Sequence, residues 1–126
     1  MKKIGPENSS YEVTVQEMVS SLRFKYSLHD KILPGAPDLV FPRRKKVVFV
    51  NGCFWHAHTG CRRSTLPTSN TLFWRKKILG NKKRDKSDHI KLRKRGWQYL
   101  VIWQCEIKKS NIDNLKAKIR SFLTSE

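Results

Sequence analysis

The apolar residues in the first part of the chain follow two different periods. Over residues 11–22 they recur at the three- and four-residue spacing of one helical face, with Ser9 or Ser10 available as the N-terminal cap. Three short segments, at residues 23–28, 37–41 and 45–50, are then rich in alternating or β-branched apolar residues and are separated by turn residues. The pattern predicts a helix followed by three strands in a meander.

The second part of the chain predicts two basic helices, a strand and a last helix. The helices cover residues 71–79 and 81–96, with Gly80 between them and Gly96 as the C-terminal stop. Residues 97–105 (WQYLVIWQC) are almost continuously apolar, which is typical of a buried central strand, and residues 111–123 have helical periodicity. We therefore expect an α/β fold, with a mixed central sheet flanked by helices in one domain of residues 1–126.

The charge of the chain indicates a polyanionic partner. Its 126 residues carry 27 Lys and Arg against 10 Asp and Glu, a formal net charge of +17. Residues 1–42 are balanced, so the whole excess lies in residues 43–126, and eleven basic residues fall between Arg75 and Arg95. A charge of this size favours double-stranded DNA as the partner, bound with strong salt dependence.

Other partners and compartments are less consistent with the sequence. No stretch approaches the length of apolar residues that a membrane-spanning helix requires, and the N-terminal MKKIGPENSS has no apolar core of a signal peptide. We therefore expect a monomeric cytoplasmic protein, associated with the nucleoid, and no membrane partner.

The stretch FVNGCFWHAHTGC, at residues 49–61, contains a candidate metal site. Cys53, His58 and Cys61 form a C-x4-H-x2-C pattern, and Cys105 at the end of the predicted central strand is the remaining cysteine. In a chain with intracellular character this set favours a closed structural Zn²⁺ site over a disulfide. The alternative is that the cysteines are small buried apolar residues and that His58 is an ordinary surface residue.

Asp38 is a second candidate for metal binding. It stands at the start of a predicted strand, and the next strand ends at Val50, so its carboxylate should lie beside the last backbone carbonyls of that neighbour. Mg²⁺ prefers such oxygen ligands, with waters and phosphate oxygens completing the shell. An Asp that follows Pro in a turn also caps or is simply solvated, and spacing alone does not separate these roles.

His56 is the candidate proton carrier, with Asp85 or Asp88 as its partner. A carboxylate fixes the tautomer of a histidine and raises its basicity, which suits the activation of water. Both acids are surrounded by Lys and Arg, so intrahelical ion pairs are the competing interpretation.

Phe54 and Trp55 lie between the candidate ligands. Fixed on a loop of the basic part, they would stack on bases or wedge between base pairs. The alternative is that they are buried beneath the metal loop.

Three stretches together resemble the very short patch repair (Vsr-type) DNA mismatch endonucleases. They are LPGAPDLVFPRRKKVVFVNGCFWHAHTGC, FWRKKILGNKKRD and GWQYLVIWQCE, and the resemblance runs from the N-terminus to Glu106. It implies a restriction-endonuclease-like fold, cleavage of one strand at a T:G mismatch with Mg²⁺, and a structural zinc site.

The resemblance also implies roles for individual residues. Asp38 and the backbone carbonyl of Val50 would bind Mg²⁺, His56 would be the catalytic histidine with Asp85 as its acidic partner, and Glu12 would support them. Zinc would be bound by Cys53, His58, Cys61 and Cys105. Phe54, Trp55 and Met1 would form the wedge that enters DNA beside the mismatch.

Asn51 departs from the pattern, because the best-known members have a second active-site histidine at that position. An amide hydrogen bond would there replace a proton donor or a phosphate contact. Two alternatives to mismatch repair stay open: a sequence-specific nicking or restriction endonuclease of the same fold, and a non-catalytic, zinc-stabilised DNA-binding protein.

Overall fold

The computed structural model describes residues 6–28 and 30–125, which form three helices and a four-stranded sheet. The helices are α1 (Pro6–Ser21), α2 (Thr71–Lys94) and α3 (Ile112–Thr124). The strands are β1 (Ser27–Leu28), β2 (Leu39–Phe41), β3 (Lys46–Asn51) and β4 (Gln98–Trp103). The expected order of a helix, three strands, a helical region, a strand and a helix is confirmed.

The sheet has the order β1-β2-β3-β4 and is mixed, as expected. β1, β2 and β3 form the predicted antiparallel meander, with Leu39 opposite Val48, and β4 pairs parallel to β3, with Val50 opposite Ile102. The parallel pairing follows from α2, because a crossover long enough to return the chain to the same end of the sheet separates the two strands.

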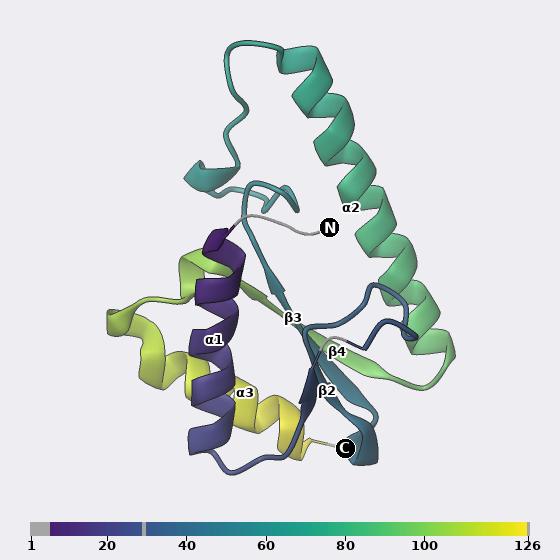
Figure 1. The fold of residues 1–126 in the computed structure, drawn as a ribbon, viewed down its shortest axis with the longest axis vertical. Helices are drawn as coiled ribbons and strands as arrows, with labels where there is room; N and C mark the ends of the chain where they lie inside the picture. Colours follow the sequence, from purple (N-terminus) through teal and green to yellow (C-terminus); the bar gives the residue numbers. More distant parts are fainter. Residues whose placement is uncertain (1–5, 29, 126) are drawn as a thin grey trace.

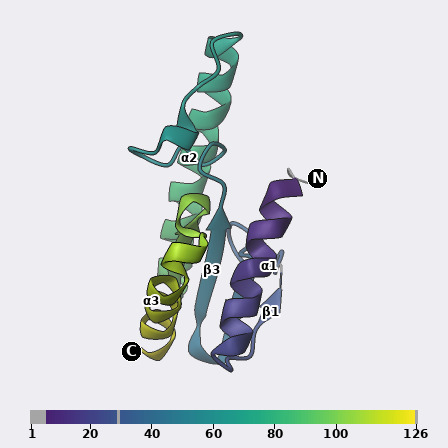
Figure 2. The same cartoon turned by 90° about the vertical axis from the view of Figure 1, so that its left-hand side faces the viewer.

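Helices cover both faces of the sheet, as Figures 1 and 2 show. On one face, α1 and α3 pack over a core that includes Val15, Leu39, Val48, Ile102 and Leu115. On the opposite face, α2 covers a smaller cluster of buried residues, namely Val40, Val47, Phe49 and Leu92. Because side chains alternate along a strand, neighbouring residues of β3 and β4 serve the two cores in turn.

The predicted break at Gly80 is wrong, since α2 is one helix of 24 residues. A glycine inside a helix costs only about 1 kcal/mol relative to alanine, which the hydrogen bonds on either side offset. The predicted stop at Gly96 is confirmed. Gly96 has a φ of +84°, and the N–H groups of Gly96 and Trp97 donate to the carbonyls of Arg93 and Leu92, which is the Schellman arrangement.

The prediction of β4 as a central strand is also wrong, because β4 is the last strand in the order of the described sheet. Its apolar character has another cause. Tyr99 and Val101 pack against the α2 cluster, whereas Leu100 and Ile102 belong to the core beneath α1 and α3. A strand covered on both faces is apolar at successive positions wherever it lies in the sheet.

The remaining boundaries differ only in detail. α1 begins at Pro6, so Ser9 and Ser10 lie inside the helix rather than at its cap, and Pro suits the first helical position. The strand expected at 23–28 is reduced to Ser27–Leu28, since Arg23 has a φ of +67° in the turn that follows α1. No helix in the described part of the chain has the length and apolarity needed to cross a membrane.

Candidate active site and metal centre

Four candidate metal ligands meet beyond the end of β3. The ligand atoms of Cys53, His58, Cys61 and Cys105 all lie within 4.8 Å of one another. Three come from residues 52–61, which we call the Cys/His loop, and Cys105 comes from the 3-10 turn Gln104–Glu106 that follows β4. The parallel pairing of β3 and β4 ends both strands at the same edge, which is why residues 47 positions apart converge.

The Cys/His loop is held by a few main-chain hydrogen bonds and by side chains from outside it, among them that of Gln104. The N–H groups of His56 and His58 donate to the carbonyls of Gly52 (3.2 Å) and Cys53 (2.9 Å). The Gln104 side chain accepts from the N–H of Cys53 at 3.2 Å and donates to the hydroxyl of Tyr11 on α1 at 3.0 Å. Tyr11 and Gln104 thus connect the loop to the body of the protein.

The cluster fits a tetrahedral metal such as zinc. Zinc bonds of about 2.0 to 2.3 Å hold their ligand atoms a little under about 4 Å apart, so the observed set needs only a small contraction. Burial raises the pKa of the Cys53 thiol to about 12, whereas a backbone hydrogen bond at Arg63 lowers the pKa of Cys61. A buried thiol in this environment would ionise when a cation replaces its proton.

His56 and Asp85 form the closest side-chain pair of the site. The Nδ1 of His56 lies 2.5 Å from Oδ2 of Asp85, and both side chains are a little under one-third exposed. Of the two acids that the sequence offered, the structure selects Asp85. An ionised carboxylate only accepts, so Nδ1–H donates the hydrogen bond to Asp85, and Nε2 is left with the lone pair that a general base requires.

Asp38 lies beside Val50, as the sequence predicted, but its contact there is with the amide. Oδ2 of Asp38 accepts from the N–H of Val50 at 2.6 Å, and the N–H of Asp38 donates to the carbonyl of Val48 at 3.1 Å. β2 begins only at Leu39, so the N–H of Val50 lies beyond the last paired residue of β2, and the carboxylate satisfies it. The alternation along the strand places Asp38 on the same face as Val40, which is the face covered by α2.

A cavity of about 540 Å³ lies between α2, the end of β3 and β4. Its walls include the buried Asn51, both members of the His56–Asp85 pair, and three residues of β4 that alternate toward α2. The cations Lys82, Lys86 and Arg93 of α2 also line it. The cations of this cavity would attract a phosphodiester, and a histidine held by a carboxylate could take a proton from the water that attacks it.

The aromatic residues of the loop are neither free nor fully buried. Phe54 and Trp55 are half-buried and meet edge to face, with ring centroids 5.1 Å apart. Trp74 of α2 contacts both rings at 5.6 and 5.8 Å. The carbonyl of Trp55 also accepts from the Asn81 side chain at 3.0 Å, so α2 fixes this pair from the side.

The remaining predicted residues are Glu12, Met1 and Asp88. Glu12 is half-buried on α1 and accepts from the Gln16 side chain at 3.0 Å. Met1 lies outside the described residues. Asp88 lines the hollow near residues 31–36, and it is Asp85 that contacts His56.

Sequence reasoning missed Trp74, His89, Tyr99, Gln104 and Tyr11. Their signals are weak in the sequence, since an aromatic residue on a basic helix or at a strand end is usually a packing residue. Only the tertiary contacts distinguish them: Trp74 meets the loop aromatics, and Gln104 links Tyr11 to the loop.

The sequence of the chain is similar to a known family and to several known proteins. The family described as DNA mismatch endonuclease Vsr matches residues 1–63. The type II nicking enzyme V.XorIIP of Xanthomonas oryzae pv. oryzae is 42% identical over 123 residues, which cover 98% of this chain and 88% of that protein. The type II nicking enzyme V.NmeAIP of Neisseria meningitidis is 39% identical over 112 residues, covering 89% and 79%. The DNA mismatch endonuclease Vsr of Escherichia coli is 32% identical over 108 residues, covering 86% and 69%.

Proposed function

Because the chain belongs to the Vsr family of DNA mismatch endonucleases, we propose that it nicks one strand of duplex DNA at T:G mismatches by Mg²⁺-dependent hydrolysis, in very short patch repair. The observation that carries the proposal is the His56–Asp85 pair in a cavity lined by lysine and arginine. The E. coli relative bears the name of a mismatch endonuclease, and the family supports a hydrolytic enzyme over the non-catalytic alternative.

His56 performs the proton transfer in this mechanism. Its Nδ1–H is held by Asp85, so Nε2 takes a proton from water as the water oxygen attacks phosphorus. The bond between phosphorus and the 3′ oxygen then breaks, and this oxygen takes a proton from water, which leaves a 5′-phosphate and a 3′-hydroxyl. Lys82, Lys86 and Arg93 hold the charged backbone in the cavity, and Asn51 offers an amide hydrogen bond to the same phosphate.

Asp38 and the carbonyl of Val50 are the proposed Mg²⁺ ligands, with Glu12 as a supporting acid. One carboxylate on the face of the sheet that carries Asn51 fits the preference of Mg²⁺ for one or two carboxylates, completed by waters and phosphate oxygens. When bound, Mg²⁺ would polarise the phosphate and stabilise the leaving oxygen. Asp38 already accepts one hydrogen bond from Val50, which fixes the direction of its carboxylate.

The Cys/His cluster is the proposed structural zinc site. Four protein ligands leave no open position for substrate, so the cluster stabilises the loop and does not act on DNA. Phe54 and Trp55 at the loop, with Met1, would wedge into the base stack beside the mismatch. We expect the whole domain to be a monomer of the restriction-endonuclease-like fold.

A second candidate is nicking at a matched sequence. The Xanthomonas and Neisseria relatives are named type II nicking enzymes, and both are more similar to this chain than the E. coli relative is. The chemistry at the cavity is the same for both candidates, so the two differ only in which duplex is cut.

The deciding experiment uses two pools of duplexes with the same randomised flanks, one with a central T:G pair and one with C:G. Sequencing of the nicked strands with and without Mg²⁺ gives both the specificity and the sequence context. We expect nicks only with Mg²⁺ and only in the T:G pool. Equal cutting of both pools at a fixed sequence would establish the matched-site enzyme instead.

Two variants connect the activity to the proposed residues. Asp38→Ala and His56→Ala should each reduce nicking by about 10²-fold or more while DNA binding persists. Wild-type activity in either variant would refute the assignment of that residue.

A further inference from the structure

His89 occupies an unusual place in the cavity. It lies on α2 one turn after Asp85, and helical residues four apart are neighbours on one face, so it stands beside the His56–Asp85 pair. The mechanism above gives it no role. His89 is therefore a second imidazole in the cavity that is lined by Lys82, Lys86 and Arg93.

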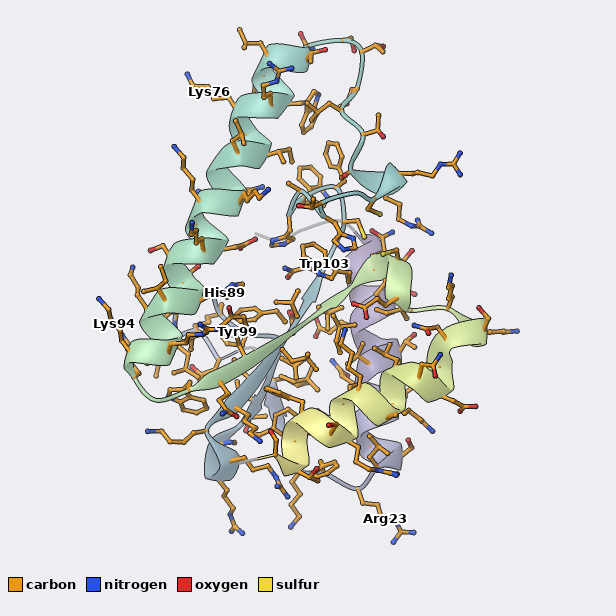
Figure 3. The ribbon with its side chains drawn as sticks, turned by 180° about the vertical axis from the view of Figure 1, so that it is seen from behind. Arg23, Lys76, His89, Lys94, Tyr99 and Trp103 are labelled. Atoms are coloured by element: carbon orange, nitrogen blue, oxygen red, sulfur yellow. The ribbon has the colours of Figure 1, made fainter. Side chains whose placement is uncertain are left out.

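Stacking fixes the orientation of the His89 ring. The ring lies almost parallel to that of Tyr99, with centroids 4.1 Å apart and an angle of 16°, and the Phe49 ring meets it at 5.2 Å. Figure 3 shows His89 and Tyr99 next to each other between α2 and β4. A ring that is stacked on one neighbour and contacted by a second is limited in its rotation, so the directions of its nitrogens are set before any ligand arrives.

The nitrogens of His89 are available to a ligand. Neither makes a hydrogen bond to any described residue, although the side chain is half-buried. Among the described residues no buried side-chain nitrogen or oxygen lacks a partner, so these nitrogens are reached from the cavity. Burial lowers the pKa of His89 more than Asp85 and Asp88 raise it, so the ring is neutral at neutral pH and carries one N–H donor.

We propose that His89 is a substrate-contacting residue, which donates a hydrogen bond to a DNA phosphate next to the one that is cut. The proposal rests on the function proposed above, because it places the scissile phosphate at His56. Lys86 and Arg93 line the cavity one turn before and one turn after His89, and supply the charge that draws a phosphate to this point. A neutral donor between two cations fixes the position of the phosphate, which a mobile cation alone does not.

The competing role is aromatic packing alone, and His89→Phe separates the two. Phenylalanine keeps the stack on Tyr99 and removes both nitrogens. We expect His89→Phe to weaken binding of the cognate duplex about tenfold. The rate constant for nicking within the protein–DNA complex should change less than about threefold. His89→Gln, which retains an N–H donor, should recover part of the affinity. Ser87→Ala on the exposed side of α2 is the matched control, and should bind as the wild type does.

Methylphosphonate substitution identifies the phosphate. Each phosphate flanking the nick is replaced in turn by the neutral methylphosphonate, and binding of the whole protein is measured without Mg²⁺. At one position the methylphosphonate should lower the affinity of the wild type about tenfold, whereas His89→Phe should bind the modified and the unmodified duplex equally. Equal losses in the two proteins at every position, or wild-type affinity in His89→Phe, would overturn the proposal.

The binding measurement is independent of cleavage. If the wild type nicks DNA but loses as much affinity as His89→Phe at every methylphosphonate, the role of His89 is rejected and the endonuclease proposal stands. If the effects of the variant and of one methylphosphonate are not additive but the protein nicks no duplex, the role of His89 in binding stands and the endonuclease proposal is rejected.

Discussion

The Cys/His loop and helix α2 build the two sides of one cavity by opposite means. The loop has almost no regular structure, and its shape depends on side chains: four converging ligand atoms and the Gln104 amide. α2 is held by its own main chain over 24 residues, and only Ile78 and Leu92 are buried. Figure 1 shows its N-terminal end extending beyond the sheet, while Figure 3 shows Lys76 and Lys94 pointing outward from it.

This difference divides the tasks of the site. A helix presents residues at a fixed rise, so Lys82, Asp85, His89 and Arg93 reach the cavity from successive turns. A loop fixed by ligands brings residues with no common period to one place, as with His56 beside the aromatic pair. The two regions meet at the His56–Asp85 hydrogen bond, and also where Trp74 and Asn81 of α2 contact the loop aromatics.

Removal of the proposed zinc should have the largest effect, because it would affect the loop and leave α2 intact. Treatment with a zinc chelator, or Cys105→Ser, is expected to reduce nicking more than about 100-fold, since a structural zinc site contributes on the order of 10 kcal/mol. The decrease in melting temperature measures the loss of stability, and emission spectrometry measures the metal content. Re-addition of zinc is the control for the chelator. Unchanged melting and activity in a protein free of metal would contradict the assignment.

The same site predicts a pH dependence. In the metal-free fold the pKa of Cys53 is raised from 9.0 to about 12, so its thiol form stabilises the apo protein fully below pH 9, and this contribution is lost as the pH rises from 9 toward 12. Metal binding has the opposite sign, because the ligand must lose its proton. Zinc affinity, measured by competition with a chelating dye, should therefore increase with pH.

Weakening the His56–Asp85 link between loop and helix should have an intermediate effect. Asp85→Asn keeps the size of the side chain but no longer fixes the tautomer of His56, so nicking should slow by about 10- to 100-fold. Asp88→Asn, three residues along α2, is the matched control and should stay within about twofold of the wild type. Equal losses in both variants, measured under single-turnover conditions, would mean that only the net charge of α2 matters.

The smallest effect concerns α2 alone. A Cβ added at Gly80 meets nothing within 4 Å, so Gly80→Ala should stabilise the protein by about 0.5 to 1 kcal/mol without changing activity. Urea unfolding measures the gain. Gly35→Ala is the contrasting variant: its φ is +81° and the new Cβ would lie 3.0 Å from the Phe49 ring, so it should destabilise the protein.

Periodicity predicted most of the fold, and its errors have identifiable causes. The meander, the last helix and the stop at Gly96 follow from local signals, which the structure retains. The break predicted at Gly80 is wrong because the free-energy cost of one glycine is small compared with the stabilisation from the hydrogen bonds of a long helix. The place of β4 at the end of the sheet was missed, because an apolar strand records what covers its faces and not which strands lie beside it.

By itself the sequence determined which chemistry could meet within the Cys/His loop. Cys53, His58 and Cys61 are separated by so few residues that chain length alone keeps them near one another, and the basic charge of residues 43–126 is a property of composition. The resemblance already implied Cys105 for the cluster and Asp85 for His56, whereas only the tertiary structure shows that they make these contacts and that His89 lines the cavity. These positions depend on the parallel register of β3 with β4 and on the course of α2 across the sheet, which no local pattern encodes.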